Sequence, residues 1–388
     1  MASPAPRGVL AMAKAQEFET VLDQSDATVA SFDDHKSFLN RVQHTLHSNQ
    51  AAVPLIVLIL SVAIFGVLVG GKFFNAFSLT LIIQQVAIVG IVGAAQTLVI
   101  LTAGIDLSVG AIMVLSSVVM GQFAFRYGIP VPLSILCGLG CGALCGFVNG
   151  WLIAYMKLPP FIVTLGSWQV FNATKYIYSR NETIRGQDIE AQAPLLQLFG
   201  DKLKCDGKPW QNLFCDYIPP IRYLFDGLQS IGAVVPLGVV FMVLLVVYLW
   251  YVLNYTAWGR RLYAVGDDPD AADLAGVPVK RMLLVVYTLS GLICAFAGWV
   301  LIGRIGSVSP TSGEFANIES ITAVVIGGIS LFGGRGSILG MIFGALIVGV
   351  FSLGLRLYGA DAQWTYLLIG VLIIGAVAVD QWIRKVAG

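Results

Sequence analysis

The feature that most constrains this chain is a series of apolar runs, each close to the ~20 residues that a helix needs to cross a bilayer. They lie at 52–71, 79–103, 107–125, 131–156, 160–179, 232–254, 282–304, 319–333, 337–358 and 364–383. Of the 388 residues, 57% are hydrophobic and 12% are charged, which is about half the charged share of a soluble domain. The sequence therefore predicts an all-α polytopic membrane protein with about ten transmembrane helices in one domain at 51–388.

Lysine and arginine set the expected orientation, because they concentrate near the cytoplasmic ends of membrane spans. With both termini inside, the inner segments hold Lys36, Arg41, Lys157, Arg260, Arg261, Lys280, Arg281, Arg335, Arg384 and Lys385. The outer short connections hold only Lys72, Arg126, Arg304 and Arg356. We therefore expect cytoplasmic termini, a long outer connection at 180–231 and a cytoplasmic loop at 255–281. Residues 1–50 are polar and lack an apolar period, so they are predicted to be a disordered cytoplasmic tail.

Several classes of function are disfavoured by composition. A net charge of +1 gives no broad basic surface for nucleic acid. The three histidines, His35, His44 and His47, all precede the first apolar run, so a histidine-dependent triad, zinc site or proton relay in the membrane lacks its usual residue. No G-x-x-x-x-G-K-[ST] motif occurs, so the chain cannot cradle a nucleotide's phosphates. We predict no catalytic residue, metal site or cofactor.

Small residues recur at helical spacing in two of the runs. Glycine lets helices in lipid approach closely, and the two glycine ladders are Gly138, Gly142, Gly146, Gly150 and Gly336, Gly340, Gly344. Packing is the favoured reading, with bare backbone lining a pore as the alternative. Cys137, Cys141 and Cys145 are expected to pack in the same way. Cys205 and Cys215 flank a polar stretch between runs, and whether they form a disulfide stays open.

Asp106, in the motif GIDLSVG, is the only acidic residue between the start of the first run and the end of the fifth. An ionisable side chain inside a membrane is costly and marks a functional position by default. Two readings stay open: Asp106 caps a helix beginning at Leu107, or it lies on a solute path. Amides in apolar surroundings either join helices or contact a polar solute. The predicted substrate-pathway residues are Gln84, Gln96, Asp106 and Asn149.

The segment between Thr256 and Met282 contains a complete set of helix start and stop signals. Asp268 can cap a short helix whose first residue is Pro269, and Gly276 can end it in the left-handed conformation. Such a short helix is not stable alone, so a neighbour must hold it, either this chain's own spans or another protein. The alternative is a helix lying on the inner leaflet, which its acidic residues oppose near anionic lipid.

Five segments resemble a known family: 97–117, 157–166, 259–282, 289–310 and 319–340. They read TLVILTAGIDLSVGAIMVLSS, KLPPFIVTLG, GRRLYAVGDDPDAADLAGVPVKRM, LSGLICAFAGWVLIGRIGSVSP and ESITAVVIGGISLFGGRGSILG. Together they resemble the ribose/arabinose/xylose-type permeases of bacterial ABC importers. The stretches 84–110 and 264–277 are most similar to the fructose-import members of that family.

The resemblance implies a multi-pass protein of the bacterial inner membrane that moves a monosaccharide into the cytoplasm. Fructose is favoured, with ribose, mannose and xylose as alternatives. It also implies a homodimer, two cytoplasmic ATP-binding subunits that hydrolyse the ATP, and a periplasmic sugar-binding protein. The connection 180–231 would then be periplasmic.

The motif of Asp270, Ala271, Ala272 and Gly276 is similar to the loop by which importer permeases engage their ATPases, with aspartate in place of the more usual glutamate. The resemblance thus implies a coupling role for Gly266, Asp268, Pro269, Asp270, Ala271, Ala272, Asp273 and Gly276. One departure is the stretch 202–229, which looks like an insertion on the outer face.

Two other classes of protein are weighed against this reading. The first is a proton-coupled secondary sugar transporter that uses Asp106, with Glu314 or Glu319, as the titrating group. The second is a membrane scaffold or enzyme, for which the sequence offers no supporting set of residues.

Overall fold

The computed structural model describes residues 51–202, 227, 230, 232 and 234–387. Within these residues the chain is helical, and the only β-pairings are two isolated bridges, Ile184 with Val308 and Lys202 with Pro236. This confirms an all-α protein over the described part. The predicted tail 1–50, Cys205, Cys215 and most of the stretch 202–229 lie outside the described residues.

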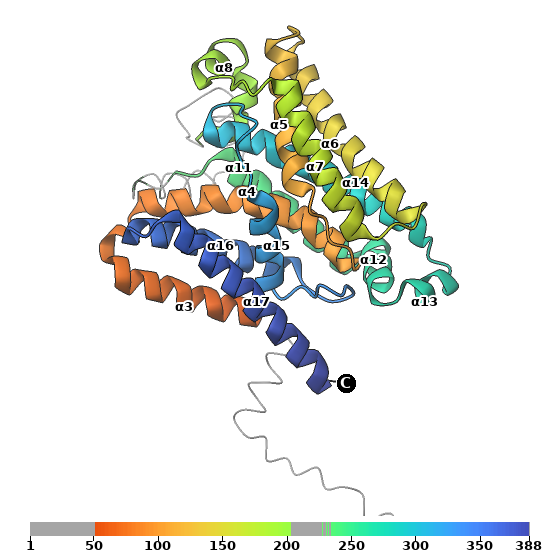
Figure 1. The fold of residues 1–388 in the computed structure, drawn as a ribbon. Helices are drawn as coiled ribbons and strands as arrows, with labels where there is room; N and C mark the ends of the chain where they lie inside the picture. Colours follow the sequence, from red (N-terminus) through yellow and green to blue (C-terminus); the bar gives the residue numbers. More distant parts are fainter. Residues whose placement is uncertain (1–50, 203–226, 228–229, 231, 233, 388) are drawn as a thin grey trace, which may run out of the picture. The chain divides into compact units, whose positions relative to one another are not determined.

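Every predicted apolar run coincides with a helix in Figure 1. These are α3 (Ala52–Val69), α4 (Ala76–Leu101), α5 (Val109–Phe125), α6 (Val131–Ala154), α7 (Pro160–Ser179), α11 (Leu237–Tyr255), α14 (Val279–Ile305), α15 (Ala316–Ile326), α16 (Ile338–Tyr358) and α17 (Ala362–Ala387). Shorter helices are η1 (Gly70–Lys72), α8 (Gly186–Gln192), η2 (Pro194–Gly200), α12 (Ala257–Asp267) and α13 (Pro269–Leu274). In the described part of the chain, 6 helices are long and apolar enough to cross a membrane: α3, α4, α6, α11, α14 and α16.

The run 319–333 differs most from its expected form. Its helix, α15, has 11 residues and ends at Ile326, and the chain then continues without regular structure to α16. Four glycines in this connection have positive φ: Gly328, Gly333, Gly334 and Gly336. Glycine adopts these angles without the steric cost that other residues carry. The run is apolar enough to look like one span, but its glycines end the helix early.

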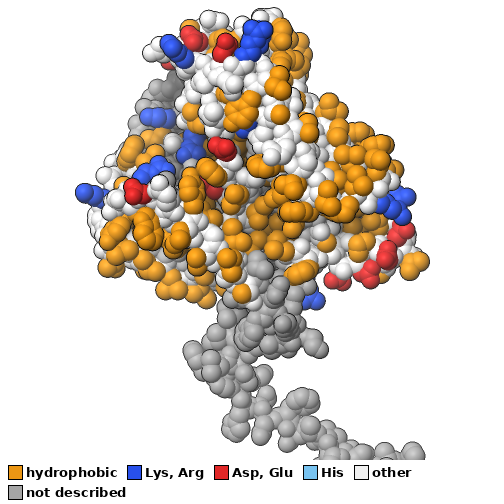
Figure 2. Space-filling view, in the orientation of Figure 1, with side chains coloured by type: hydrophobic (Ala, Val, Ile, Leu, Met, Phe, Trp, Pro, Cys, Tyr) orange, Lys and Arg blue, Asp and Glu red, His pale blue; other side chains and the backbone are white. Residues whose placement is uncertain are grey.

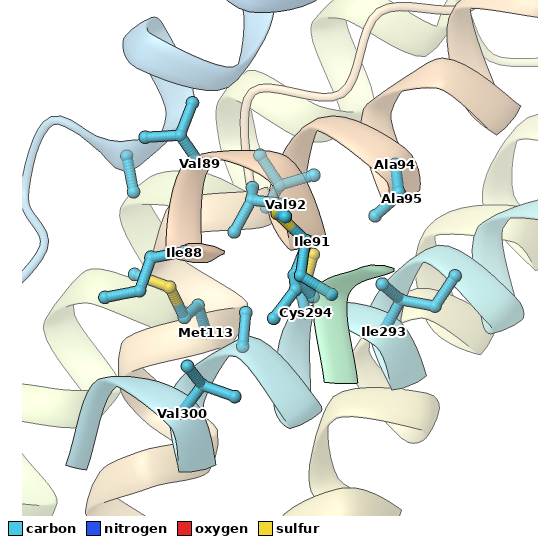
Figure 3. Close-up of a cluster of buried hydrophobic side chains, with 14 of the residues drawn as sticks. Ile88, Val89, Ile91, Val92, Ala94, Ala95, Met113, Ile293, Cys294 and Val300 are labelled. Carbon is cyan, nitrogen blue, oxygen red and sulfur yellow. The ribbon is translucent and has the colours of Figure 1, made fainter. Parts of the chain in front are cut away.

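The core of the described bundle is formed by α4, α14 and α16. In the most apolar stretches of these helices, 61%, 67% and 61% of the residues are buried, against 17% for α3 and 28% for α11. Figure 3 shows side chains of α4, α5 and α14 meeting in this core, among them Ile91, Met113 and Cys294. Figure 2 shows a broad cover of hydrophobic side chains on the outside of the bundle. Buried core helices and an apolar exterior are the arrangement expected of a helical bundle in lipid.

Both glycine ladders pack helices together within this chain. A Cβ atom placed on Gly142 would lie 2.6 Å from the carbonyl oxygen of Gly291 on α14, and one on Gly146 would collide with the carbonyl oxygen of Tyr287. In the second ladder, a Cβ atom on Gly340 would collide with the carbonyl oxygen of Gly327, and one on Gly344 would collide with that of Ala323 on α15. The favoured packing reading is confirmed. Cys145 is buried beside the first ladder, and Cys137 and Cys141 are partly buried.

Candidate substrate-path and coupling sites

The first candidate site is a non-helical break, residues 102–108, between α4 and α5. Asp106 lies inside it and is buried, at 1% exposed. Its Oδ1 atom accepts hydrogen bonds from the backbone N–H of Ser108 at 2.8 Å and from the Ser108 hydroxyl at 2.6 Å. Helix α5 begins at Val109 rather than Leu107, so the carboxylate bonds the residue just before the helix. Ser108 is the N-cap residue of α5, and no side chain bonds the first N–H groups of this helix. Asp106 therefore closes the turn before the helix and does not cap it directly.

Neighbouring helices hold the break in place by hydrogen bonds. The Asn149 amide of α6 donates to the Ser108 hydroxyl at 2.9 Å. The Thr164 hydroxyl of α7 donates to the carbonyl oxygen of Ile105 at 3.0 Å, and the Asn317 amide of α15 donates to that of Leu107 at 3.4 Å. The structure therefore brings Asp106 and Asn149 together through Ser108.

Several polar atoms buried in the interior of the bundle have no hydrogen-bond partner among the described residues. They include Oδ1 of Asn149, the hydroxyl of Tyr287 and both amide atoms of Gln96. The Tyr287 hydroxyl would lie 2.5 Å from a Cβ atom on Gly104, so it packs directly against the break. An unsatisfied buried polar group costs about 1–3 kcal/mol, and most such groups in proteins bind water or another partner. These atoms are suited to a hydroxylated solute or water.

Gln84 lies apart from this cluster. It is 12 residues before Gln96 on α4, which corresponds to about 18 Å along a helix. Gln84 and Arg304 line a cavity of about 50 Å³ together with Ala87, Phe199, Gly200, Pro236, Gly238, Val239, Val300 and Gly303. The next residue, Gln85, donates a hydrogen bond to the Glu319 carboxylate at 3.1 Å. The predicted pathway residues thus divide into two groups.

The second candidate site is the short helix α13, which has the start and end that the sequence predicts. The Asp268 carboxylate accepts hydrogen bonds from the backbone N–H groups of Asp270 and Ala271, both at 3.0 Å. Pro269 is its first residue, and Gly276 follows it with φ of 82°. The helix is held by the chain itself, because Ala272 is buried and α13 packs against α12 and α14.

The outer face of α13 is acidic around one exposed apolar side chain. Asp268, Asp270 and Asp273 are exposed, and Leu274 is 91% exposed. Figure 2 shows the corresponding group of acidic side chains over α13. Gly266 is buried at the end of α12, away from this face. The predicted coupling residues therefore comprise an exposed set on and beside α13 and two buried members, Gly266 and Ala272.

Residues 78–377 match the family described as "Branched-chain amino acid transport system / permease component". The chain belongs to this permease family. The permease is 69% identical to the fructose import permease protein of Rhizobium meliloti, over 96% of this chain and 97% of the relative. It is 35% identical to the ribose import permease protein of Bacillus subtilis (strain 168), over 84% and 92% of the two chains. It is 31% identical to a xylose transport system permease protein of Escherichia coli (strain K12), over 81% and 87%. No solved structure matches it.

Family membership and the apolar helices together identify a multi-pass permease of the bacterial inner membrane, as the sequence predicts. Its relatives are named as permeases. The chain is thus a transporter subunit and not an enzyme.

Sequence reasoning missed several residues of the permease's two sites. Ser108 and Thr164 lie within the motifs GIDLSVG and KLPPFIVTLG, so a signal for them existed. Tyr287 and Asn317 had none, because each reaches the break from a helix far along the chain. Leu274 was not singled out, because the prediction for its segment used only the helix caps and the charged residues.

Proposed function

We propose that this permease is the membrane-spanning subunit of an ATP-binding-cassette importer that moves a monosaccharide, fructose being favoured, into the cytoplasm. The observation that carries the proposal is the 69% identity to a fructose import permease over nearly the full length of both chains. The relatives named for ribose and xylose are also monosaccharide permeases. They support a sugar substrate over the amino acids of the family description.

The energy for import is supplied by two cytoplasmic ATP-binding subunits that dock on α13. This helix is capped at its start and held by α12 and α14, and it exposes Leu274 within an acidic face. An apolar side chain surrounded by charges of one sign suits a partner groove with an apolar floor and a basic rim. The coupling residues are Gly266, Asp268, Pro269, Asp270, Ala271, Ala272, Asp273 and Gly276. A second copy of this chain and a periplasmic sugar-binding protein complete the importer.

The permease crosses the inner membrane with ten helices and keeps both termini in the cytoplasm. Figure 1 supports opposite sides for the two long connections, since α8 and α13 lie at opposite ends of the bundle. Residues 180–231 then form the periplasmic connection, 255–281 the cytoplasmic coupling loop, and 1–50 a cytoplasmic tail that precedes the permease domain 51–388. The short helices α5 and α15 complete their crossings with the non-helical breaks beside them.

The sugar path runs past the break that contains Asp106. The unpartnered atoms of Asn149 and Gln96 lie in the interior of the bundle, where hydroxyl groups of a sugar would satisfy them. Gln84, beside the Arg304 cavity, marks a second polar point on the same path.

The test is uptake of radiolabelled fructose into proteoliposomes that contain the permease, its ATP-binding subunits and the binding protein. We expect uptake that requires ATP inside the liposomes and stops when the phosphate-binding lysine of the ATP-binding subunit is replaced. The control applies a proton gradient without ATP. Uptake that persists without the ATP-binding subunits and follows that gradient would contradict the proposal and favour the secondary transporter.

A further inference from the structure

Three segments that are distant in sequence meet backbone to backbone beside α13. They are the end of α12, the end of α4 with the start of the first break, and the second break between α15 and α16. We call the meeting point, formed by Leu101, Ala103, Gly266, Gly333 and Gly334, the glycine junction.

No room exists for a side chain at the three glycines of the junction. A Cβ atom on Gly266 would collide with the carbonyl oxygen of Leu101 and lie 2.7 Å from the backbone nitrogen of Gly334. One on Gly333 would lie 2.6 Å from the carbonyl oxygen of Gly266, and one on Gly334 would lie 2.9 Å from Cα of Asp267. Because backbone meets backbone, no flexible side chain is present to absorb a displacement.

Two hydrogen bonds fix the register of the junction. The backbone N–H of Gly334 donates to the carbonyl oxygen of Leu101 at 3.1 Å. Leu101 is the last residue of α4, so this bond satisfies a carbonyl that the helix leaves free. The Tyr263 hydroxyl of α12 donates to the carbonyl oxygen of Gly336 in the second break at 2.9 Å. Burial raises the pKa of Tyr263, which keeps the hydroxyl protonated as a donor.

The junction is close in sequence to both candidate sites. On one side, Asp268 alone separates the end of α12 from the start of α13. On the other side, Ala103 precedes Asp106 by three residues within the first break. The end of α12 and the contacting residues of the glycine junction therefore connect α13 to the first break.

We infer that the glycine junction transmits movement of α13 to both breaks at once, and that Tyr263 is the positioning residue that holds α12 against the second break. The inference rests on the proposed function, because it takes α13 as the element that the ATP-binding subunits move. Small shifts at one site are amplified into larger rearrangements because packed interfaces switch between discrete arrangements and do not deform continuously. A contact of α12 with both breaks makes their movement simultaneous.

The experiment measures sugar uptake per ATP hydrolysed by the full importer in proteoliposomes. Tyr263→Phe removes the hydroxyl and keeps the ring, whereas Gly334→Ala places a methyl group against Asp267. For each variant we expect normal recovery with the ATP-binding subunits and continued ATP hydrolysis. Tyr263→Phe should lower uptake per ATP about fivefold, the effect of losing one ordinary hydrogen bond. Gly334→Ala keeps its backbone N–H and should lower the same ratio because its methyl group displaces α12 from the second break. A purely structural defect would lower hydrolysis and uptake together.

Matched controls are available in the chain. Gly128 has φ of 63°, close to the 69° of Gly334, and a Cβ atom there would meet nothing within 4 Å, so Gly128→Ala tests the conformational cost alone. Tyr248 on α11 is 65% exposed, so Tyr248→Phe tests the loss of a surface hydroxyl. Both controls should keep the wild-type ratio.

Two results would overturn the inference. The first is an unchanged uptake-to-ATP ratio in both junction variants. The second is loss of the ATP-binding subunits from the purified variants, which would make the junction part of docking rather than transmission. Failure of the proposed function is visible separately, because the wild-type importer would then take up sugar without ATP.

Discussion

At the scale of single residues, Asp106 acts mainly as a hydrogen-bond acceptor in this structure. Both of its hydrogen bonds come from Ser108, which in turn accepts from Asn149. An ionised carboxylate makes such bonds shorter and stronger than a neutral acceptor does. The sequence left the capping and pathway readings open, and these contacts show a carboxylate that shapes the break.

Substitutions of Asp106 separate these readings. Asp106→Ala removes the acceptor for the amide and hydroxyl of Ser108, so we expect it to lower the free energy of unfolding by about 1–3 kcal/mol. Asp106→Asn keeps an acceptor oxygen and should lose less stability and retain uptake with an unchanged pH profile. Thermal unfolding in detergent and uptake at several pH values measure these effects. A stable Asp106→Asn protein without uptake would instead show that the negative charge itself serves transport.

Only part of this site was predictable from local sequence. Asp106 stands out because it is a charge in an apolar region. Its surroundings do not, because the hydrogen bonds that build them join residues separated by 41, 59 and 210 positions. Helical periodicity shows which face of a helix is apolar, but not which polar side chain on another helix meets it.

At the scale of elements, prediction succeeded where the signals are local and failed where they are not. The start and end of α13 follow from Asp268, Pro269 and Gly276, whose effects act within one turn. The length of α15 did not follow, because a hydropathy window reads the apolar residues after Ile326 as part of the span. Those residues pack in a connection whose shape depends on glycine φ angles, which hydropathy does not register.

The first glycine ladder offers a prediction with a control on the same helix. A Cβ atom on Gly146 would collide with the backbone of Tyr287, whereas one on Gly140 would meet nothing within 4 Å. We expect Gly146→Ala to separate α6 from α14 and to destabilise the protein by about 1–3 kcal/mol, the usual cost of overpacking. Gly140→Ala should be neutral or slightly stabilising, since alanine favours helix formation.

Thermal unfolding of the two purified variants in the same detergent measures this difference. Equal unfolding temperatures would show that α6 and α14 separate without cost, contrary to the close packing described above.

At the scale of the whole described bundle, the helix that leads toward each break packs against helices beside the other break. Helix α4, which leads into the first break, packs against α15 and α16 on either side of the second. Helix α14, which leads into α15, packs against α5 and α6 beyond the first break. A movement of α4 therefore displaces helices beside the second break, and a movement of α14 displaces helices beside the first. With this packing, a movement of α12 at the glycine junction would displace helices beside both the first and the second break.

The orientation of this bundle in the membrane gives the last prediction. If α13 faces the cytoplasm and α8 the periplasm, a membrane-impermeant maleimide should distinguish two single-cysteine variants in a background whose 6 native cysteines are replaced by serine. Gln187→Cys lies on the exposed surface of α8 and should react in intact spheroplasts. Leu274→Cys, at a position 91% exposed, should react only after permeabilisation, because the inner membrane shields it.

The cysteine-free protein is the control for background labelling. The reverse pattern would place the termini outside. Reaction of both variants in intact spheroplasts would contradict the single span, α11, that separates α8 from α13 in the proposed topology.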